Sequence, residues 1–179
     1  NLLLSLDKDW KVGKTCYIGG IFGVNAVYPG LPSNNIAGTN LENSGNIEIC
    51  GEITCDRFGI GGVLGYVQSD RRFSQLTNSG DITVKSGAKL KNTHASKGSF
   101  IGGIVGTTYD NTLQFSDLTN TAEASITIED GVEVNAKSPY RIGGCVGIIG
   151  AKVNNLENNG AITIGAQIKD LYCGGVAGQ

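Results

Sequence analysis

Two short patterns of apolar and polar residues recur along this chain, and both predict strands. The first is an apolar residue, two glycines, two more apolar residues and a glycine, as in Ile101-Gly102-Gly103-Ile104-Val105-Gly106. Its five copies begin at residues 18, 60, 101, 142 and 173, at spacings of 42, 41, 41 and 31 residues. A nearly constant spacing of this kind indicates a repeat architecture.

The second pattern follows the first and is clearest in Leu76-Thr77-Asn78-Ser79-Gly80-Asp81-Ile82-Thr83-Val84. Apolar and polar residues alternate in it, as they do in strands with one buried face. The Asn-x-Gly step favours a corner, because both residues tolerate positive φ. In the third repeat this phrase, 118–128, has two extra residues and lacks the glycine, which predicts a bulge or a distorted turn.

Together the patterns predict an all-β fold, a parallel β-helix (β-solenoid) with four full rungs and a partial fifth, each of three short strands. Residues 18–179 would form a single solenoid domain, and 1–17, which hold the only tryptophan, a cap or the remains of a preceding rung. The interior would contain one column of Ile18, Ile60, Ile101, Ile142 and Cys173 and a second of Leu41, Leu76, Leu118 and Leu156. The segments of unequal length between the patterns are predicted loops: 24–40, 66–75, 107–117 and 148–155, and 50–59, 85–100, 129–141 and 165–172.

Stacking the rungs would also align Asn43, Asn78, Asn120 and Asn158, whose amides could hydrogen-bond along the stack as a structural ladder. The double glycines would let one backbone pass close to another. Ile-Gly-Gly-x-x-Gly resembles a phosphate-binding loop, but no helix-forming stretch follows the glycines. We therefore expect no dinucleotide or other cofactor.

Composition narrows the classes of partner. The chain has 28 glycines and a formal net charge of −2, and its basic residues are scattered, so we expect no nucleic acid partner. No apolar run is long enough to cross a bilayer, so we expect no membrane insertion. Most of the five cysteines are interpreted as small buried hydrophobic residues, and Cys50 and Cys55, which flank a turn-like segment, are the best candidates for a disulfide.

The repeats resemble the GLUG-motif repeats of bacterial surface proteins. Gly102-Gly103-Ile104-Val105-Gly106 and Gly61-Gly62-Val63-Leu64-Gly65 match the glycine strand, and Phe73-Ser74-Gln75-Leu76-Thr77-Asn78-Ser79-Gly80-Asp81-Ile82 looks like the rest. The similarity spans about 18–178, but this chain has Asn before the corner and longer loops. It implies a secreted or cell-surface segment of a bacterial protein, of the kind found in Bacteroidales among others, and supplies no catalytic residues.

Few residues are candidates for catalysis or metal binding. His94, the only histidine, lies in a polar stretch, and the acids Asp70, Asp110, Glu129 and Asp130 lie in different predicted loops. Glu129-Asp130-Gly131 lacks the spaced oxygen ligands of a calcium loop, so we expect neither catalysis nor a metal site.

Three aromatic residues are the candidate binding residues. Tyr28, Tyr66 and Tyr109 each follow a glycine motif, so they should emerge along one edge of the stack, where exposed rings can stack on sugars or anchor a protein. The alternative is that they only shield a loop from water.

The favoured function is a non-enzymatic spacer or adhesin that presents loops to a glycan or to a host or bacterial surface protein. Open stack ends would also allow end-to-end self-association. The alternative is a carbohydrate-active β-helix enzyme, a polysaccharide lyase or glycoside hydrolase, which would need a groove lined by acids and bases. An ice-binding solenoid is disfavoured because Glu48 interrupts the threonine positions.

Overall fold

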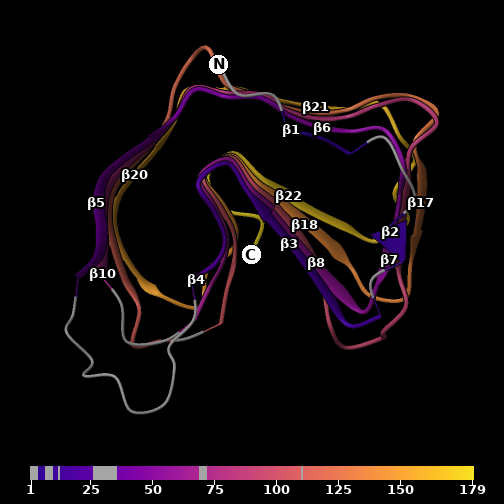
Figure 1. The fold of residues 1–179 in the computed structure, drawn as a ribbon, viewed down its shortest axis with the longest axis horizontal. Helices are drawn as coiled ribbons and strands as arrows, with labels where there is room; N and C mark the ends of the chain where they lie inside the picture. Colours follow the sequence, from indigo (N-terminus) through magenta and orange to yellow (C-terminus); the bar gives the residue numbers. More distant parts are fainter. Residues whose placement is uncertain (1–3, 7–9, 12, 26–35, 69–71, 110) are drawn as a thin grey trace.

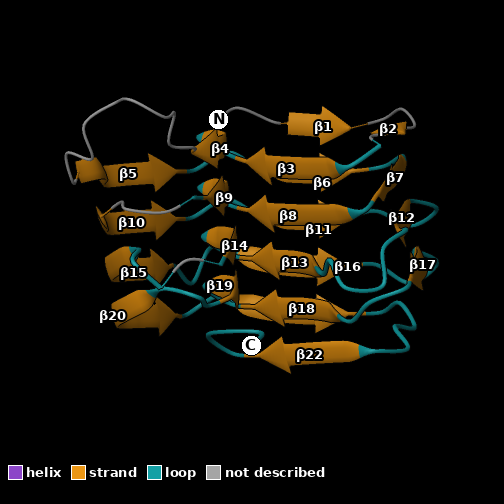
Figure 2. Ribbon diagram, turned by 90° about the horizontal axis from the view of Figure 1, so that it is seen from below, coloured by secondary structure: helices purple, strands orange, loops and turns teal. Residues whose placement is uncertain are grey.

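The fold is known from a computed structural model, which describes residues 4–6, 10–11, 13–25, 36–68, 72–109 and 111–179. The chain winds in a coil, and the strands of each turn pair in parallel with those of the next (Figures 1 and 2). The predicted parallel β-solenoid is therefore confirmed. The described part of the chain contains no helix with the length and apolarity to cross a membrane.

Each complete rung has five strands, and not the predicted three, so the strands stack into five sheets, which we number I to V in the order of the chain within a rung. Sheet I comprises β5 (Ile36–Asn43), β10 (Arg72–Asn78), β15 (Gln114–Asn120) and β20 (Lys152–Asn158). Sheet II comprises β1 (Leu4–Leu6), β6 (Ile47–Ile49), β11 (Ile82–Val84), β16 (Ser125–Ile128) and β21 (Ala161–Ile164).

The other three sheets complete the rung. Sheet III comprises β2 (Trp10–Lys11), β7 (Glu52–Cys55), β12 (Lys89–Asn92) and β17 (Glu133–Ala136). Sheet IV comprises β3 (Thr15–Gly19), β8 (Arg57–Gly61), β13 (Ser99–Gly102), β18 (Tyr140–Gly143) and β22 (Leu171–Gly174). Sheet V comprises β4 (Phe22–Asn25), β9 (Leu64–Val67), β14 (Val105–Thr108) and β19 (Val146–Ile148).

The position of sheet III corrects the sequence analysis, and strand pairing at the N-terminus extends the stack. Sheet III lies in segments that were predicted to be loops, 50–59, 85–100 and 129–141, where each four-residue strand is a brief polar–apolar alternation. At the N-terminus, β1, β2 and β3 pair with β6, β7 and β8, so the described residues of segment 1–17 continue the stack as part of a rung.

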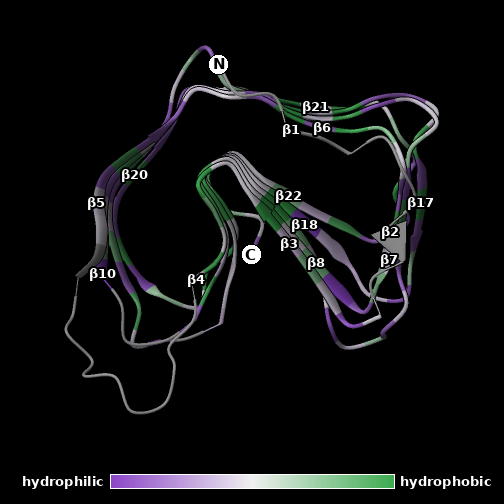
Figure 3. Cartoon of the chain, in the orientation of Figure 1, coloured by the Kyte–Doolittle hydropathy of each residue, from purple (hydrophilic) through white to green (hydrophobic). Residues whose placement is uncertain are grey.

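The predicted apolar columns are present, except that Cys173 in the last rung is exposed, and they belong to two different clusters. Ile60 and Ile101 are direct register partners and both are fully buried, in a cluster enclosed by sheets II, III and IV. Leu76 and Leu118 are likewise partners, in a second cluster between sheets I and V. Figure 3 shows apolar positions recurring from rung to rung across these sheets. The interior is thus divided, where the sequence predicted one hollow coil.

The double-glycine corner between sheets IV and V makes this division. In Figure 1 the corner points towards the junction of sheets I and II, where the asparagine column lies. A Cβ atom added to Gly62 would lie 2.4 Å from Oδ1 of Asn78 and 2.2 Å from the carbonyl oxygen of Gly103 in the next rung. Gly103 and Asn120 repeat the arrangement one rung on. Only glycine allows the corner to reach across the interior this closely.

Positive φ occurs at a place that the sequence did not indicate. Gly80 of the Asn-x-Gly corner is not among the positive-φ residues. Glycine is required at this position for another reason, because a Cβ atom would lie 2.1 Å from the carbonyl oxygen of Gly45. Instead, positive φ recurs midway along each strand of sheet I, at Asn40, Gln75, Asp117 and Asn155. This column of bulges lets Phe73 and Leu76, three residues apart, both point into the core.

The two extra residues of the third repeat are absorbed outside the strands. Between β15 and β16 the chain makes a turn in which the Ala124 N–H donates to the carbonyl oxygen of Thr121 at 3.2 Å. The register of the flanking strands is unchanged, because Asn120 still pairs with Asn158 and Ile126 with Ile162. Of the two predicted outcomes, the structure shows the distorted turn.

Candidate functional site

A continuous line of aromatic rings and guanidinium groups follows the stack along sheets IV and V, and we call it the tyrosine–arginine column. It consists of Tyr66, Tyr17, Arg57, Tyr109, Phe100, Arg141 and Tyr172. Most of these residues share one register position of sheet IV. In successive rungs that position is occupied by Tyr17, Gly59, Phe100, Arg141 and Tyr172. Because side chains alternate along a strand, this position faces away from the buried isoleucine column beside it.

The first half of the column centres on Arg57. The rings of Tyr17 and Tyr66 stack with centroids 4.7 Å apart, and the Arg57 guanidinium lies 4.5 Å from the ring centroid of Tyr109. Burial raises the pKa of the Tyr17 hydroxyl, while its hydrogen bond with Arg57 opposes that shift. Gly59 has no side chain at this level, and a Cβ there would meet Thr107 Cγ2 at 2.7 Å. The missing side chain leaves room for the neighbouring rings.

The second half of the column centres on Arg141. Its guanidinium lies 5.5 Å from the ring centroid of Phe100 and 5.4 Å from that of Tyr172. Phe100 in turn meets Tyr109 edge-on, with centroids 5.6 Å apart, which joins the two halves. Arg141 also donates hydrogen bonds to the side chain of Gln179 and the carbonyl oxygen of Pro139. The most exposed residues of the column are Tyr172 and Tyr109, which are 50% and 43% exposed to solvent.

The three tyrosines predicted to bind do not occupy equivalent positions. Tyr66 pairs in register with Thr107, whereas Tyr109 lies two residues further along its rung. Both nevertheless belong to the column, Tyr66 through Tyr17 and Tyr109 through Arg57. Tyr28 lies outside the described residues.

The sequence does contain a pattern that indicates this column, although the prediction of binding residues did not include it. Tyr17, Phe100, Arg141 and Tyr172 each stand immediately before the first residue of a glycine motif.

The asparagine column is a structural element inside the molecule. Nδ2 of Asn43 donates to Oδ1 of Asn78 at 2.9 Å, Asn78 to Asn120 at 3.0 Å, and Asn120 to Asn158 at 2.9 Å. The same Nδ2 of Asn78 also donates to the carbonyl oxygen of Gly80 at 2.8 Å. These amides therefore bond to one another and to the adjacent corner.

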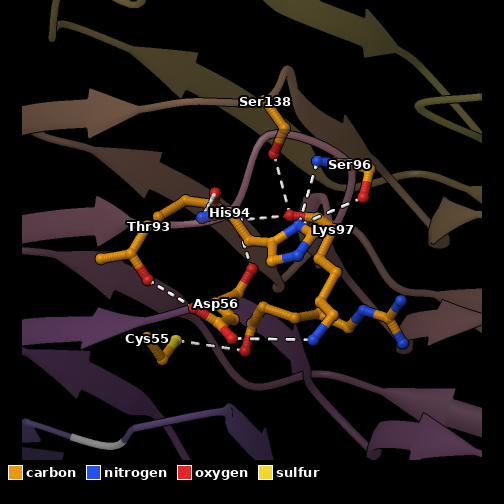
Figure 4. A network of polar contacts seen from close by, with 9 residues as sticks. Cys55, Asp56, Thr93, His94, Ser96, Lys97 and Ser138 are labelled. Carbon is orange, nitrogen blue, oxygen red and sulfur yellow. Dashed lines mark hydrogen bonds and ion pairs between the residues drawn. The ribbon is translucent and has the colours of Figure 1, made fainter.

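His94 belongs to a network that fixes a loop between sheets III and IV (Figure 4). Its Nδ1 accepts from the N–H of Ser96 at 3.2 Å and lies 3.1 Å from Oγ of Ser96. Asp56 is engaged elsewhere, accepting from Thr93 at 2.6 Å and lying 3.6 Å from Nζ of Lys97. The Thr93 hydrogen bond holds the pKa of the Asp56 carboxyl below its usual value. Serine, histidine and aspartate lie close together here, but their hydrogen bonds hold the loop in place.

The acidic residues that were candidate ligands or catalysts make ion pairs or hydrogen bonds within the protein, where the structure describes them. Glu129 lies 3.2 Å from Nζ of Lys85 and accepts from the N–H of Ser86 at 2.9 Å. Asp130 accepts from the N–H of Gly131, whose φ of 80° makes this a turn. Asp70 and Asp110 lie outside the described residues. Within the described part of the chain, no three His, Cys, Asp or Glu side chains gather closely enough to hold a metal.

All five cysteines are free, so the disulfide predicted between Cys50 and Cys55 is wrong. The reason is strand alternation, since Cys55 points into the core and Cys50 lies exposed beyond the end of β6. Burial raises the pKa of Cys55 to about 12, with a further contribution from the nearby Cys16 thiol. Burial also raises the pKa values of Cys16 and Cys145 to about 11. These thiols serve as packing groups.

Comparison with known proteins identifies no similar protein. No family model matches the chain, and neither a curated protein nor a solved structure shows significant similarity to it.

Proposed function

We propose that this chain is a non-catalytic β-solenoid module of a secreted or cell-surface bacterial protein. In this proposal it is a rigid spacer that displays the tyrosine–arginine column to a glycan or a surface protein, as expected for a GLUG-like repeat segment. The tyrosine–arginine column is the observation that supports the proposal. Aromatic rings stack on the apolar faces of sugars or on side chains of a partner, and guanidinium groups bind hydroxyl, carboxylate or carbonyl oxygens.

The architecture suits display. Apolar residues in every rung are buried against the neighbouring rungs, so the stack holds the outward side chains at a fixed spacing of about 4.8 Å per rung. The arginines of the column are already oriented by the rings beside them, at 4.5 Å for Arg57 and 5.4 Å for Arg141. A ligand therefore meets side chains that need little ordering, which lowers the entropic cost of binding.

A glycan array followed by calorimetry tests the proposal. We expect binding without product formation, and at least tenfold weaker binding in the double variant Tyr109→Ala/Tyr172→Ala, because buried aromatic contacts dominate such interfaces. Val176→Ala, which truncates an exposed apolar residue outside the column, is the matched control and should bind as the unaltered protein does. Release of cleaved sugar, or binding that survives the double variant, would contradict the proposal.

A further inference from the structure

A second surface feature, on sheet I, is distinct from the tyrosine–arginine column. An open cavity of about 630 Å³ lies over the first halves of its strands, and we call it the strand-start groove. The described residues that line it are Thr39, Arg72, Phe73, Ser74, Gln114, Phe115, Ser116, Lys152, Val153 and Asn154. Its volume is in the range of sites that take ligands of a few rings.

Register places the polar groups of the groove in two parallel rows. Arg72, Gln114 and Lys152 are partners in three successive rungs. Two residues further along the strands, Ser74 and Ser116 are partners, and Asn154 and Thr39 extend that row. The rungs are spaced by about 4.8 Å and the rows by about 7 Å, so the groove presents a lattice of hydroxyl, amide and cationic groups.

The cations of the groove have no counter-ion within the described residues. Neither Arg72 nor Lys152 makes an ion pair or a side-chain hydrogen bond there, and both are exposed. The acid nearest in sequence on the same strands, Asp117, accepts a hydrogen bond from Asn155 at 2.8 Å and does not line the groove. By contrast, Lys85, which follows β11, and Lys89 and Lys91 on β12 each pair with a glutamate.

The groove also contains apolar surface. Val153 is 38% exposed, and the side chains of Arg72 and Lys152 carry aliphatic stems below their charged ends. Phe73 and Phe115 beneath are buried and stacked with centroids 5.6 Å apart, which makes this part of the sheet rigid. Hydroxyl and amide groups beside apolar patches match a sugar, which is polar at its edge and apolar on its face.

From these observations we infer that the strand-start groove binds an acidic oligosaccharide, a short glycan that carries carboxylate groups. The two cations pair with carboxylates, the serine, asparagine and glutamine groups bond to sugar hydroxyls, and the aliphatic stems of Arg72 and Lys152 pack against ring faces. The inference rests on the proposed function, since it names a ligand class for a module proposed to bind glycans, but it concerns a separate surface.

Calorimetry with three probes tests the inference: trigalacturonate, the neutral trisaccharide maltotriose and hexaglutamate. We expect trigalacturonate to bind more tightly than either, with an affinity that falls as salt is raised. The variant Arg72→Gln/Lys152→Gln should weaken it at least tenfold, since each charge-assisted hydrogen bond contributes about that factor. Lys137→Gln, an exposed cation outside the groove, is the matched control and should leave the affinity unchanged.

The outcomes separate this inference from the proposed function. Loss of trigalacturonate binding in Arg72→Gln/Lys152→Gln but not in Tyr109→Ala/Tyr172→Ala assigns the acidic ligand to the groove. Loss only in the tyrosine variant would overturn the groove while leaving the column as a glycan site. Absence of trigalacturonate binding at millimolar concentration, equal binding of maltotriose, or tighter binding of hexaglutamate would each overturn the inference.

Discussion

The side-chain amide of Asn78 lies directly against Gly62, so closely that a single Cβ on Gly62 would lie 2.4 Å from its Oδ1. This contact joins the corner between sheets IV and V to the opposite wall and separates the two apolar clusters. It recurs between Gly103 and Asn120. The two sequence patterns, glycine pair and asparagine, are therefore two sides of one internal contact.

Alanine at Gly62 should therefore be strongly destabilising. We expect Gly62→Ala to lower the free energy of unfolding by about 3 kcal/mol or more, because the new methyl group meets backbone that cannot move aside. Gly175 holds the same place in the last copy of the motif, and a Cβ there meets nothing within 4 Å. Gly175→Ala should thus be neutral within about 1 kcal/mol. Equal losses in the two variants, measured by urea denaturation, would refute the close-approach explanation.

The asparagine column makes a second stability prediction. Asn78→Ala removes two donated hydrogen bonds and leaves the buried Oδ1 of Asn120 and the carbonyl oxygen of Gly80 without that donor. We expect a loss of about 2 kcal/mol or more in the free energy of unfolding. Asn158→Ala, at the end of the column, has one amide neighbour and should cost less. A larger loss at Asn158 than at Asn78 would be inconsistent with the column.

Thiol reactivity should distinguish the cysteines. We expect iodoacetamide at pH 8 to alkylate exposed Cys50 and Cys173 in the folded protein. Cys16, Cys55 and Cys145 should react only in denaturant, because they are buried and their pKa values are raised to about 11, 12 and 11. Peptide mass spectrometry reads the sites, and denatured protein is the control in which all five react. Rapid labelling of Cys55 in the folded state would show that its strand does not face the core.

Acid should destabilise the fold through named carboxylates. Hydrogen bonds from Thr54 and from the Ser86 N–H, with help from Lys91 and Lys85, lower the pKa values of Glu52 and Glu129 below the usual 4.5. A lowered folded-state pKa contributes stability that is present above the unfolded value and is lost as pH falls. The free energy of unfolding should therefore decline below about pH 4.5.

Charge-neutral variants test the origin of that decline. Glu129→Gln should make the pH dependence shallower, while Glu42→Gln, which removes an exposed carboxylate with no ion pair in the described structure, should leave it unchanged. Denaturant titrations at pH 7, 5, 4 and 3 give the comparison. A decline that is identical in both variants would mean that other groups are responsible.

Much of the stack follows from sequence because its signal is repeated. The spacing of the glycine motif and the alternation around Leu76 are enough to predict parallel rungs with aligned isoleucines and leucines. Sheet III was missed because its strands are four residues long and lie in segments whose lengths differ between repeats. The positive φ of Gln75 carries no residue signal at all. It follows from the need for Phe73 and Leu76 to face the same side.

The sites were less predictable than the fold. Tyr66 and Tyr109 were identified from their place after the glycine motif, but their contacts depend on Arg57 and Tyr17, which precede a motif. The strand-start groove depends on the register of sheet I, which aligns Arg72 with Gln114 and Lys152. Each of the three stands four residues before the leucine of the second pattern, but their side chains differ, so the spacing alone does not indicate a binding site.

The stacking of rungs is tested most directly by nuclear Overhauser effects between isoleucine methyl groups in selectively labelled protein. We expect strong cross-peaks between Ile60 and Ile101 and between Ile101 and Ile142, which are register partners. We expect none between Ile60 and Ile142, which are two rungs or about 10 Å apart. An Ile101 methyl group with contacts to neither Ile60 nor Ile142 would contradict the stacked coil, and with it both proposed binding surfaces.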